Sequence, residues 1–169
     1  MKAIQIITIF TLIASNIIAQ NLLNTQKNDS HYIGLIKTTF YENKIEEAKS
    51  LPFFKSLHYR KQLRKIQNSK KLYYTIETQL IDTVNHRMVV QIVCQNMSLF
   101  EKHNAGRNIL ALINTETDSL ISILGNNPSI AFRDVQWTKN YVIANNTMIG
   151  LFAWNRITGE SKGNVFTGS

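Results

Sequence analysis

Residues 72–95, LYYTIETQLIDTVNHRMVVQIVCQ, decide the fold of this chain. Apolar and polar side chains alternate on both sides of residues 83–85, a pattern typical of two strands joined by a tight hairpin. If Asp82 faces His86, one face of the hairpin is strongly apolar and the other is mixed. We expect the apolar face to pack against helices and the mixed face to be partly wet or to line a cavity.

The strand pattern continues on the C-terminal side of this hairpin. Five further segments have the apolar spacing of strands: NILALI (108–113), SLISIL (119–124), SIAFRDVQW (129–137), YVIA (141–144) and MIGLFAW (148–154). We interpret the first two as a second hairpin, with a short helix as the alternative for residues 119–124, and the last two as a third hairpin. Residues 158–169 are polar and contain glycine, so we expect a loose tail there.

The segment before the first hairpin has the signals of helices. Asn43 and Glu46 have the spacing of an N-cap with a returning carboxylate, and Pro52 interrupts that helix or opens a second one. After Pro52 the apolar residues recur at helical spacing, and we expect the basic residues to lie mostly on the opposite side. The expected apolar stripe consists of Phe53, Phe54, Leu57, Tyr59, Leu63 and Ile66.

Taken in order, these elements predict an α+β fold. The helices precede the strands and do not alternate with them, which disfavours a parallel α/β sheet. We expect an N-terminal helix or helix pair packed on a curved antiparallel sheet of six to seven strands, in a single domain over residues 20–169. A small antiparallel β-barrel is the alternative.

The first twenty residues, MKAIQIITIFTLIASNIIAQ, have the form of a secretory signal. Lys2 precedes an apolar stretch, and Ala19 offers a small residue at a cleavage point before Gln20, so residues 1–19 are predicted to be a signal peptide. A retained membrane anchor is the alternative, although the stretch is short and interrupted for a spanning helix. We expect an exported protein, periplasmic or extracellular, with no membrane span after cleavage.

The composition excludes several classes of protein. With 169 residues, of which 44% are hydrophobic, two Pro and one Cys, the chain is not disordered, collagen-like or stapled by disulfides. The single Cys94 lies on the apolar face of the first hairpin. There a buried core thiol is the expected state, and a reactive nucleophile is the alternative.

The excess positive charge is concentrated in residues 55–71. The formal net charge is +8, and this segment contains seven basic residues and no acidic one. A solvated helix face explains such a pattern. So does a docking surface for a polyanion, which would be nucleic acid, anionic lipid headgroups, an acidic glycan or an acidic protein. The candidate binding residues are Tyr59, Arg60, Lys61, Arg64 and Lys65. A dedicated single-strand platform is not indicated, because only the tyrosine can stack on a base.

Aromatic residues of the strands define a second candidate site, an apolar pocket between sheet and helix for a small ligand. Trp137 and Trp154 are its principal candidates. Further candidate lining residues are Tyr73, Tyr74, Phe132 and Phe152. A plain hydrophobic core is the competing interpretation, because aromatics at strand spacing commonly fill cores.

Motifs for cofactors and metals are missing from the sequence. It contains no glycine-rich phosphate loop, no dinucleotide fingerprint and no closely spaced pair of histidines, so no cofactor or metal is expected. Glu77 and Arg87 share a face of the predicted hairpin, and His103 follows in a loop. A base, an acid and a cation of these types suit the cleavage of RNA.

Three functional hypotheses remain. The leading one is an exported binding protein without enzymatic activity, which uses the basic helix or the apolar pocket. A small secreted hydrolase, in particular a ribonuclease that uses Glu77, Arg87 and His103, is the first alternative. A structural or assembly subunit is the second.

Overall fold

A computed structural model describes residues 29–97, 106–127, 132–146 and 150–166. The chain divides into two units, Met1–Tyr32 and Ile33–Ser169, and the strands that the structure describes belong to the second. The predicted signal peptide at residues 1–19 and the candidate catalytic His103 lie outside the described residues.

Two described helical stretches precede the strands. Residues 29–47 are helical and continue into the 3-10 helix η1 (Ala48–Ser50), and Pro52 then caps α2 (Phe53–Gln67). The expected helix start at Asn43 is wrong, because the apolar stripe of the first helix begins earlier. The buried members of that stripe are Ile36, Phe40, Tyr41, Ile45 and Ala48.

The described strands are antiparallel to their neighbours and form two four-stranded sheets, with the orders β1-β2-β3-β4 and β5-β6-β7-β8. The first sheet consists of β1 (Tyr74–Asp82), β2 (Arg87–Cys94), β3 (Asn108–Asn114) and β4 (Ser119–Asn127). The second consists of β5 (Arg133–Trp137), β6 (Tyr141–Asn146), β7 (Gly150–Asn155) and β8 (Ser161–Phe166). The α+β class and the antiparallel pairing are therefore as predicted.

Two details of the prediction are wrong, whereas the second hairpin is confirmed because β3 pairs with β4. The strands form two sheets, so neither a single sheet of six to seven strands nor one closed barrel is seen among the described residues. Residues 119–124 belong to strand β4, which excludes the helical alternative. Residues 161–166 form β8 and pair with β7, where a loose tail from residue 158 was expected.

The first sheet carries apolar side chains on both of its faces, and both faces are covered. All seven residues after the first in β2 are buried, whichever face they occupy. On one face the hydroxyl oxygen of Tyr74 lies 3.1 Å from that of Tyr41 on the first helix. A sheet that is apolar on both faces needs a cover on each, which explains why the C-terminal strands form a second sheet.

The core on the other face joins the two sheets. Its fully packed members are Val89, Leu110, Leu112, Leu124, Phe132, Val142, Ala144 and Trp154. The Phe132 and Trp154 rings meet edge to face with their centroids 6.0 Å apart. The face that the sequence predicted to be wet or to line a cavity is therefore hydrophobic core between the sheets.

The β1–β2 hairpin follows the predicted register only up to Ile76. A bulge between Ile76 and Thr78 then shifts the pairing by one residue, so that Asp82 faces Arg87 in place of His86. Because side chains alternate between the faces, this shift turns the last residues of β1 to the face opposite the predicted one.

Candidate functional site

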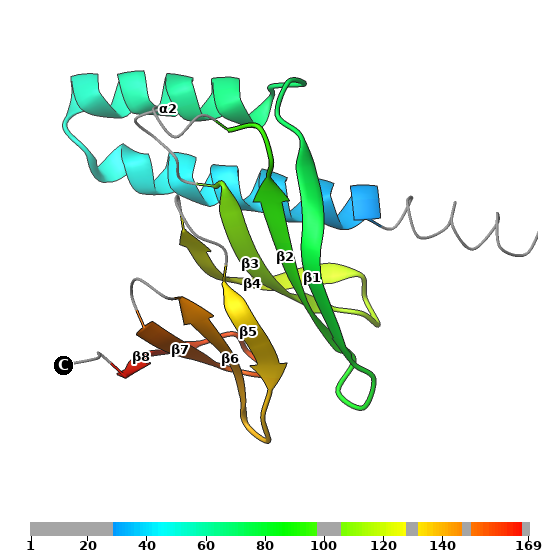
Figure 1. Ribbon diagram of the computed structural model, residues 1–169. Helices are drawn as coiled ribbons and strands as arrows, with labels where there is room; N and C mark the ends of the chain where they lie inside the picture. The colour runs from blue at the N-terminus through cyan, green and yellow to red at the C-terminus, as the bar shows by residue number, and fades with distance from the viewer. Residues whose placement is uncertain (1–28, 98–105, 128–131, 147–149, 167–169) are drawn as a thin grey trace, which may run out of the picture. The chain divides into compact units, whose positions relative to one another are not determined.

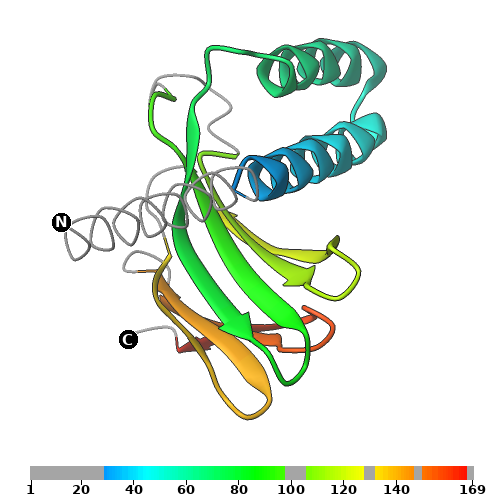
Figure 2. The same cartoon turned by 90° about the vertical axis from the view of Figure 1, so that its right-hand side faces the viewer.

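Helix α2 carries most of the basic segment. Its fifteen residues contain neither Gly nor Pro, and the Ser56 N–H donates to the carbonyl of Pro52 at 2.9 Å, which closes the first turn. Arg64 and Lys65 lie in the last turn, where the helix dipole favours cations. Two views show α2 alongside residues 33–47 of the first helix (Figures 1 and 2).

Only a narrow edge of α2 is buried, formed by Ser56 and Leu63. An α-helix turns by about 100° per residue, which places one continuous set of exposed residues on the opposite side. We call this set the outward face: Phe53, Phe54, Leu57, Lys61, Arg64 and Lys65. The expected separation of apolar and basic residues onto two sides is therefore wrong. Of the predicted apolar stripe, only Leu63 is fully buried.

The first turn of α2 presents an apolar tip, formed by Leu51, Phe53, Phe54 and Leu57. The Phe53 and Phe54 side chains are 74% and 82% exposed. Their rings meet edge to face, with centroids 5.4 Å apart. Leu51 and Leu57 are also exposed, at 42% and 51%. A single exposed apolar residue is ordinary, whereas adjacent exposed apolar residues are a feature that interaction surfaces share.

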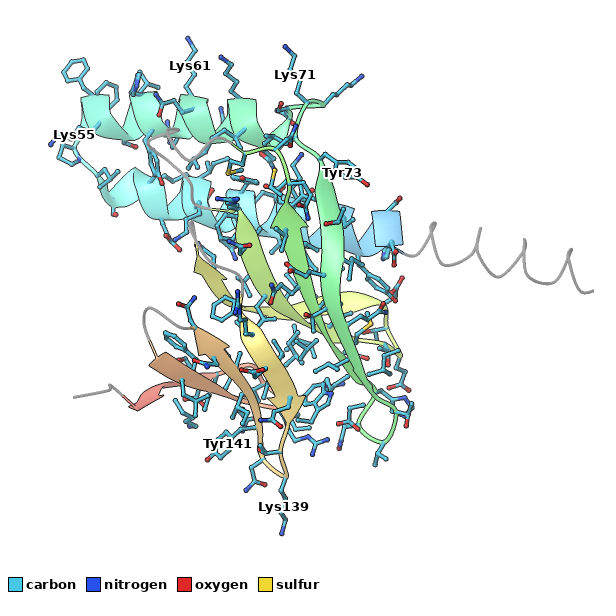
Figure 3. All side chains as sticks on the ribbon, viewed as in Figure 1. Lys55, Lys61, Lys71, Tyr73, Lys139 and Tyr141 are labelled. Carbon is cyan, nitrogen blue, oxygen red and sulfur yellow. The ribbon has the colours of Figure 1, made fainter. Side chains whose placement is uncertain are left out.

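The basic residues of this segment are not neutralised within the part of the chain that the structure describes. None of the seven forms an ion pair there. By contrast, Lys44 and Lys49 of the preceding helical residues pair with Glu47 and Glu46, at 2.6 and 2.5 Å. Figure 3 shows Lys61 and Lys71 projecting away from the sheets. Six of the seven cations are exposed, and Arg60 is partly buried.

Two of the five predicted binding residues lie beside the outward face. Tyr59 is partly buried and lines a shallow hollow of about 370 Å³ with Leu51, Lys55 and His58. Arg60 is partly buried, and its Nε has no hydrogen-bond partner among the described residues. Lys61, Arg64 and Lys65 remain fully available. The sequence did not predict that the two phenylalanines are exposed. Their spacing is that of a buried stripe, and only the packing of α2 in the folded chain determines their exposure.

The residues of the hydrolase hypothesis are not brought together. Gln91 lies next to Glu77, with its side-chain nitrogen 3.5 Å from Glu77 Oε2. Arg87 is four residues from Gln91 along β2, a distance of about 13 Å. Its guanidinium is held by the carbonyls of Asn85 and His86, both at 3.1 Å. The third candidate, at position 103, lies outside the described residues, so the structure shows no catalytic geometry.

The tryptophans lie in and beside the core between the sheets. Trp154 is 2% exposed and stacks on Phe152, with ring centroids 5.8 Å apart. Trp137 packs against the same core, and the guanidinium of Arg156 lies 5.4 Å from its ring centroid. These contacts match the plain-core interpretation of the aromatics.

A hollow of about 630 Å³ lies between the first helix and β4. Its lining is mixed: Phe40, Ile121 and Ile123 contribute apolar groups, and Lys44 and Glu47 contribute charges. The two charged residues already pair with each other at 2.6 Å. Neither tryptophan lines this hollow, and it differs in lining from the expected aromatic pocket.

A buried polar cluster lies where the first helix crosses the first sheet. Tyr74 Oη donates to the carbonyl of Gly106 at 2.9 Å and is 3.1 Å from Tyr41 Oη. Burial raises the pKa of the neighbouring Cys94 thiol, and burial lowers the pKa of Lys37. A neutral thiol without exposed surface is not a nucleophile, so the expected core thiol is confirmed.

Two other kinds of feature are absent from the described residues. No group of three His, Cys, Asp or Glu residues in them has the arrangement of a metal site. None of the helices within the described ranges is long and apolar enough to cross a membrane. No protein-family model, curated protein or solved structure matches this chain significantly. The functional argument therefore depends on the geometry of the chain itself.

Proposed function

We propose that this chain is an exported binding protein that docks on a polyanion through the outward face of α2. One observation carries the proposal: seven basic residues in residues 55–71, with no acidic residue among them and no ion pair to the described residues. The rest of the chain is nearly neutral, with 12 basic and 11 acidic residues. Export is supported by the signal-like first twenty residues.

Electrostatics explains why such a surface favours a polyanion. Cations held on one helix repel one another, and a partner with many negative charges relieves that repulsion while it releases its own counterions. The fully buried Leu63 anchors α2, so its charges are ordered before binding. Preordered charges bind with a smaller loss of conformational entropy than charges on a loose tail.

The alternatives have less support. A ribonuclease requires its acid, base and cation within hydrogen-bonding reach of one phosphate, whereas Glu77 and Arg87 are held apart by the strand geometry. The mixed hollow beside β4 is a weaker candidate for an apolar ligand, because a charged pair lies in its wall. An assembly subunit would be revealed as a large oligomer in size-exclusion chromatography.

The test is the salt dependence of binding to a labelled single-stranded RNA and to heparin, followed by fluorescence anisotropy. If about four cations contact phosphates, affinity for the RNA should fall about 50-fold between about 50 and about 200 mM salt. The variant Lys61→Glu/Arg64→Glu should abolish binding. Intact RNA after incubation would also separate binding from hydrolysis.

A matched control carries the same change of charge elsewhere. Arg133→Glu/Lys139→Glu reverses two exposed cations of the second sheet and its connecting turn. Binding by this control should resemble that of the unmodified chain. Equal losses of affinity in the two variants would show that binding depends on the net charge of the protein and not on the outward face. Either that result or absence of binding at low salt would overturn the proposal.

A further inference from the structure

We infer that the polyanion is the surface of an anionic lipid bilayer, and that the apolar tip inserts between the headgroups while the neighbouring cations bind lipid phosphates. This inference rests on the proposed function, because it assigns a partner to the same outward face. It draws on an observation that the charge argument does not use: four exposed apolar side chains at one end of the basic helix.

The apolar tip has the composition of a membrane-inserting wedge. Phe53 and Phe54 are 74% and 82% exposed, and their side chains contain no polar atom that water or a hydrophilic partner could satisfy. Leu51 and Leu57 are further exposed apolar side chains at the same end of the helix, at 42% and 51%. Such side chains gain free energy only when an apolar phase removes them from water.

The cations lie further along α2 than the apolar tip, at an offset that a tilted helix converts into the depth of the membrane interface. Lys61, Arg64 and Lys65 are on the outward face together with Phe53 and Phe54, and their mean position is about 15 Å further along the helix axis. Apolar faces of interfacial helices sink about 5–10 Å into the headgroup boundary. A tilt of α2 that lowers its first turn therefore leaves the cations at the level of the phosphates, which their long side chains can follow.

Nucleic acid fits this surface less well. Single strands bind to aromatic rings that stack on bases, and Leu51 and Leu57 offer no ring. Phe53 and Phe54 are also in edge-to-face contact with each other, which is not a pair of parallel platforms. A nucleic-acid duplex would bind the cations through its phosphates, but it would leave the apolar tip in water.

A protein partner fits less well too. Lys is depleted in protein interfaces, whereas a run of Lys and Arg beside apolar residues is the pattern that anionic membranes attract. Lys55, Lys61, Lys65, Lys70 and Lys71 make up five of the seven cations. The outward face is also the convex side of a helix and offers no groove to a protruding partner.

The inference is tested by co-flotation of the full chain with vesicles of phosphatidylcholine alone and of phosphatidylcholine mixed with phosphatidylglycerol. The apolar stretch at residues 3–19 is the same in every variant, so it cannot produce a difference between variants. The unmodified chain should bind the anionic vesicles at least about tenfold more tightly than the neutral ones.

Two double variants separate the contributions. Phe53→Ser/Phe54→Ser should weaken binding to the anionic vesicles about tenfold or more, since two apolar side chains no longer leave water. Lys61→Glu/Arg64→Glu should weaken it about 100-fold or more. The control Ile81→Ser/Val84→Ser removes two apolar residues that are 57% and 85% exposed on the first hairpin, and its binding should be unchanged.

Insertion has a direct readout. In the variant Phe54→Trp, lipids brominated in the acyl chains should quench the new fluorescence, which is obtained by subtracting that of the unmodified chain. Binding to anionic vesicles without such quenching, or equal losses in the Phe and control variants, would overturn the inference.

Failure of the inference can be told from failure of the proposed function. If RNA, heparin or polyglutamate binds and the anionic vesicles do not, the partner is not a membrane, although the basic surface still binds polyanions. If neither vesicles nor polyanions bind at low salt, both proposals are wrong.

Discussion

The guanidinium of Arg156, in the turn after β7, forms an ion pair with the carboxylate of Asp82, the last residue of β1, across 74 positions of sequence. The pair joins the rims of the two sheets and is largely removed from water, with side-chain exposures of 19% and 8%. Arg156 also donates to the carbonyls of Thr138 and Lys139 at 2.9 and 3.1 Å. Asp82 in turn accepts a hydrogen bond from the Asn85 side chain at 2.8 Å. The hydrogen-bonded group of Asp82, Asn85 and Arg156 therefore connects three turns.

The first prediction concerns the pH dependence of the stability that the Asp82–Arg156 pair contributes. Burial alone would raise the pKa of Asp82, but hydrogen bonds from Arg156 and Asn85 outweigh it and hold the pKa below its ordinary value. A carboxyl with a lowered pKa stabilises the fold at pH values above its unfolded-state pKa, and that stability is lost as the pH falls through the folded-state pKa. Asp82→Asn should therefore lower the free energy of unfolding by about 1–3 kcal/mol at neutral pH.

Urea unfolding at about pH 7 and about pH 3 checks this expectation, since the ordinary pKa of Asp lies between these values. The difference between Asp82→Asn and the unmodified chain should shrink at the lower pH. The control Asp134→Asn, at an exposed position, should stay within about 0.5 kcal/mol at both. A difference that is the same at both pH values would show that the pair does not act through its charge.

The second prediction concerns the buried hydroxyls. Tyr74 has one hydroxyl hydrogen and gives it to the Gly106 carbonyl, so Tyr41 is the donor in the contact between the two tyrosines. Tyr74→Phe removes the donor to Gly106 and the acceptor for Tyr41, whereas Tyr41→Phe removes the donor to Tyr74. Tyr74→Phe should cost about 1–3 kcal/mol and Tyr41→Phe less. Thermal unfolding of both single variants measures the order, and the opposite order would contradict this assignment of donors.

The third prediction compares three glycines. Gly106 has φ +98°, and a Cβ there would lie 2.5 Å from Tyr41 Oη and 2.9 Å from a ring carbon of Phe40. Gly163 also has a positive φ, +83°, but its Cβ would meet nothing within 4 Å, and Gly34 has neither constraint. Alanine should be tolerated or stabilising at Gly34, cost about 1 kcal/mol at Gly163 and cost several times more at Gly106. Melting temperatures of the three variants test this ranking; equal effects at 106 and 163 would remove the steric argument.

The first hairpin and the second sheet show which parts of the fold the sequence could predict. Exposed and partly buried side chains alternate along β1, and β2 is an apolar run, so these two segments predict the hairpin. The bulge after Ile76 was not predictable, since one inserted residue leaves the local alternation almost unchanged. The second sheet was missed for a related reason: a strand buried on both faces, such as β2, does not say whether a helix or a sheet covers its second face.

The candidate site was predictable in charge but not in apolar exposure. Seven basic residues without an acid are visible in the sequence, whatever the fold. Phe53 and Phe54 have the spacing of a buried apolar stripe. Whether they are buried depends on tertiary packing, which local spacing does not determine. In this fold α2 is buried only along the narrow edge of Ser56 and Leu63, which leaves Phe53 and Phe54 exposed.

The fourth prediction concerns the thiol. Cys94 has no exposed surface, and burial raises its pKa, so little thiolate is present at neutral or mildly alkaline pH. A disulfide reagent such as Ellman's should modify less than a tenth of the folded protein in the time that it modifies all of the protein in urea, an estimate of about 1.4 kcal/mol of protection or more. Rapid modification under native conditions would contradict the buried position.

The fifth prediction separates the anchor of α2 from its outward face. Leu63 is fully buried, so Leu63→Ala should lower the free energy of unfolding by about 2–5 kcal/mol through lost burial and a cavity. Phe54 is 82% exposed, so Phe54→Ser should change it by no more than about 0.5 kcal/mol. Urea unfolding monitored by circular dichroism compares the two variants. If Phe54→Ser destabilises the fold as much as Leu63→Ala does, the phenylalanine belongs to the core. A stability-neutral Phe54→Ser would mean that folding does not require this exposed ring, as the proposed insertion into a membrane assumes.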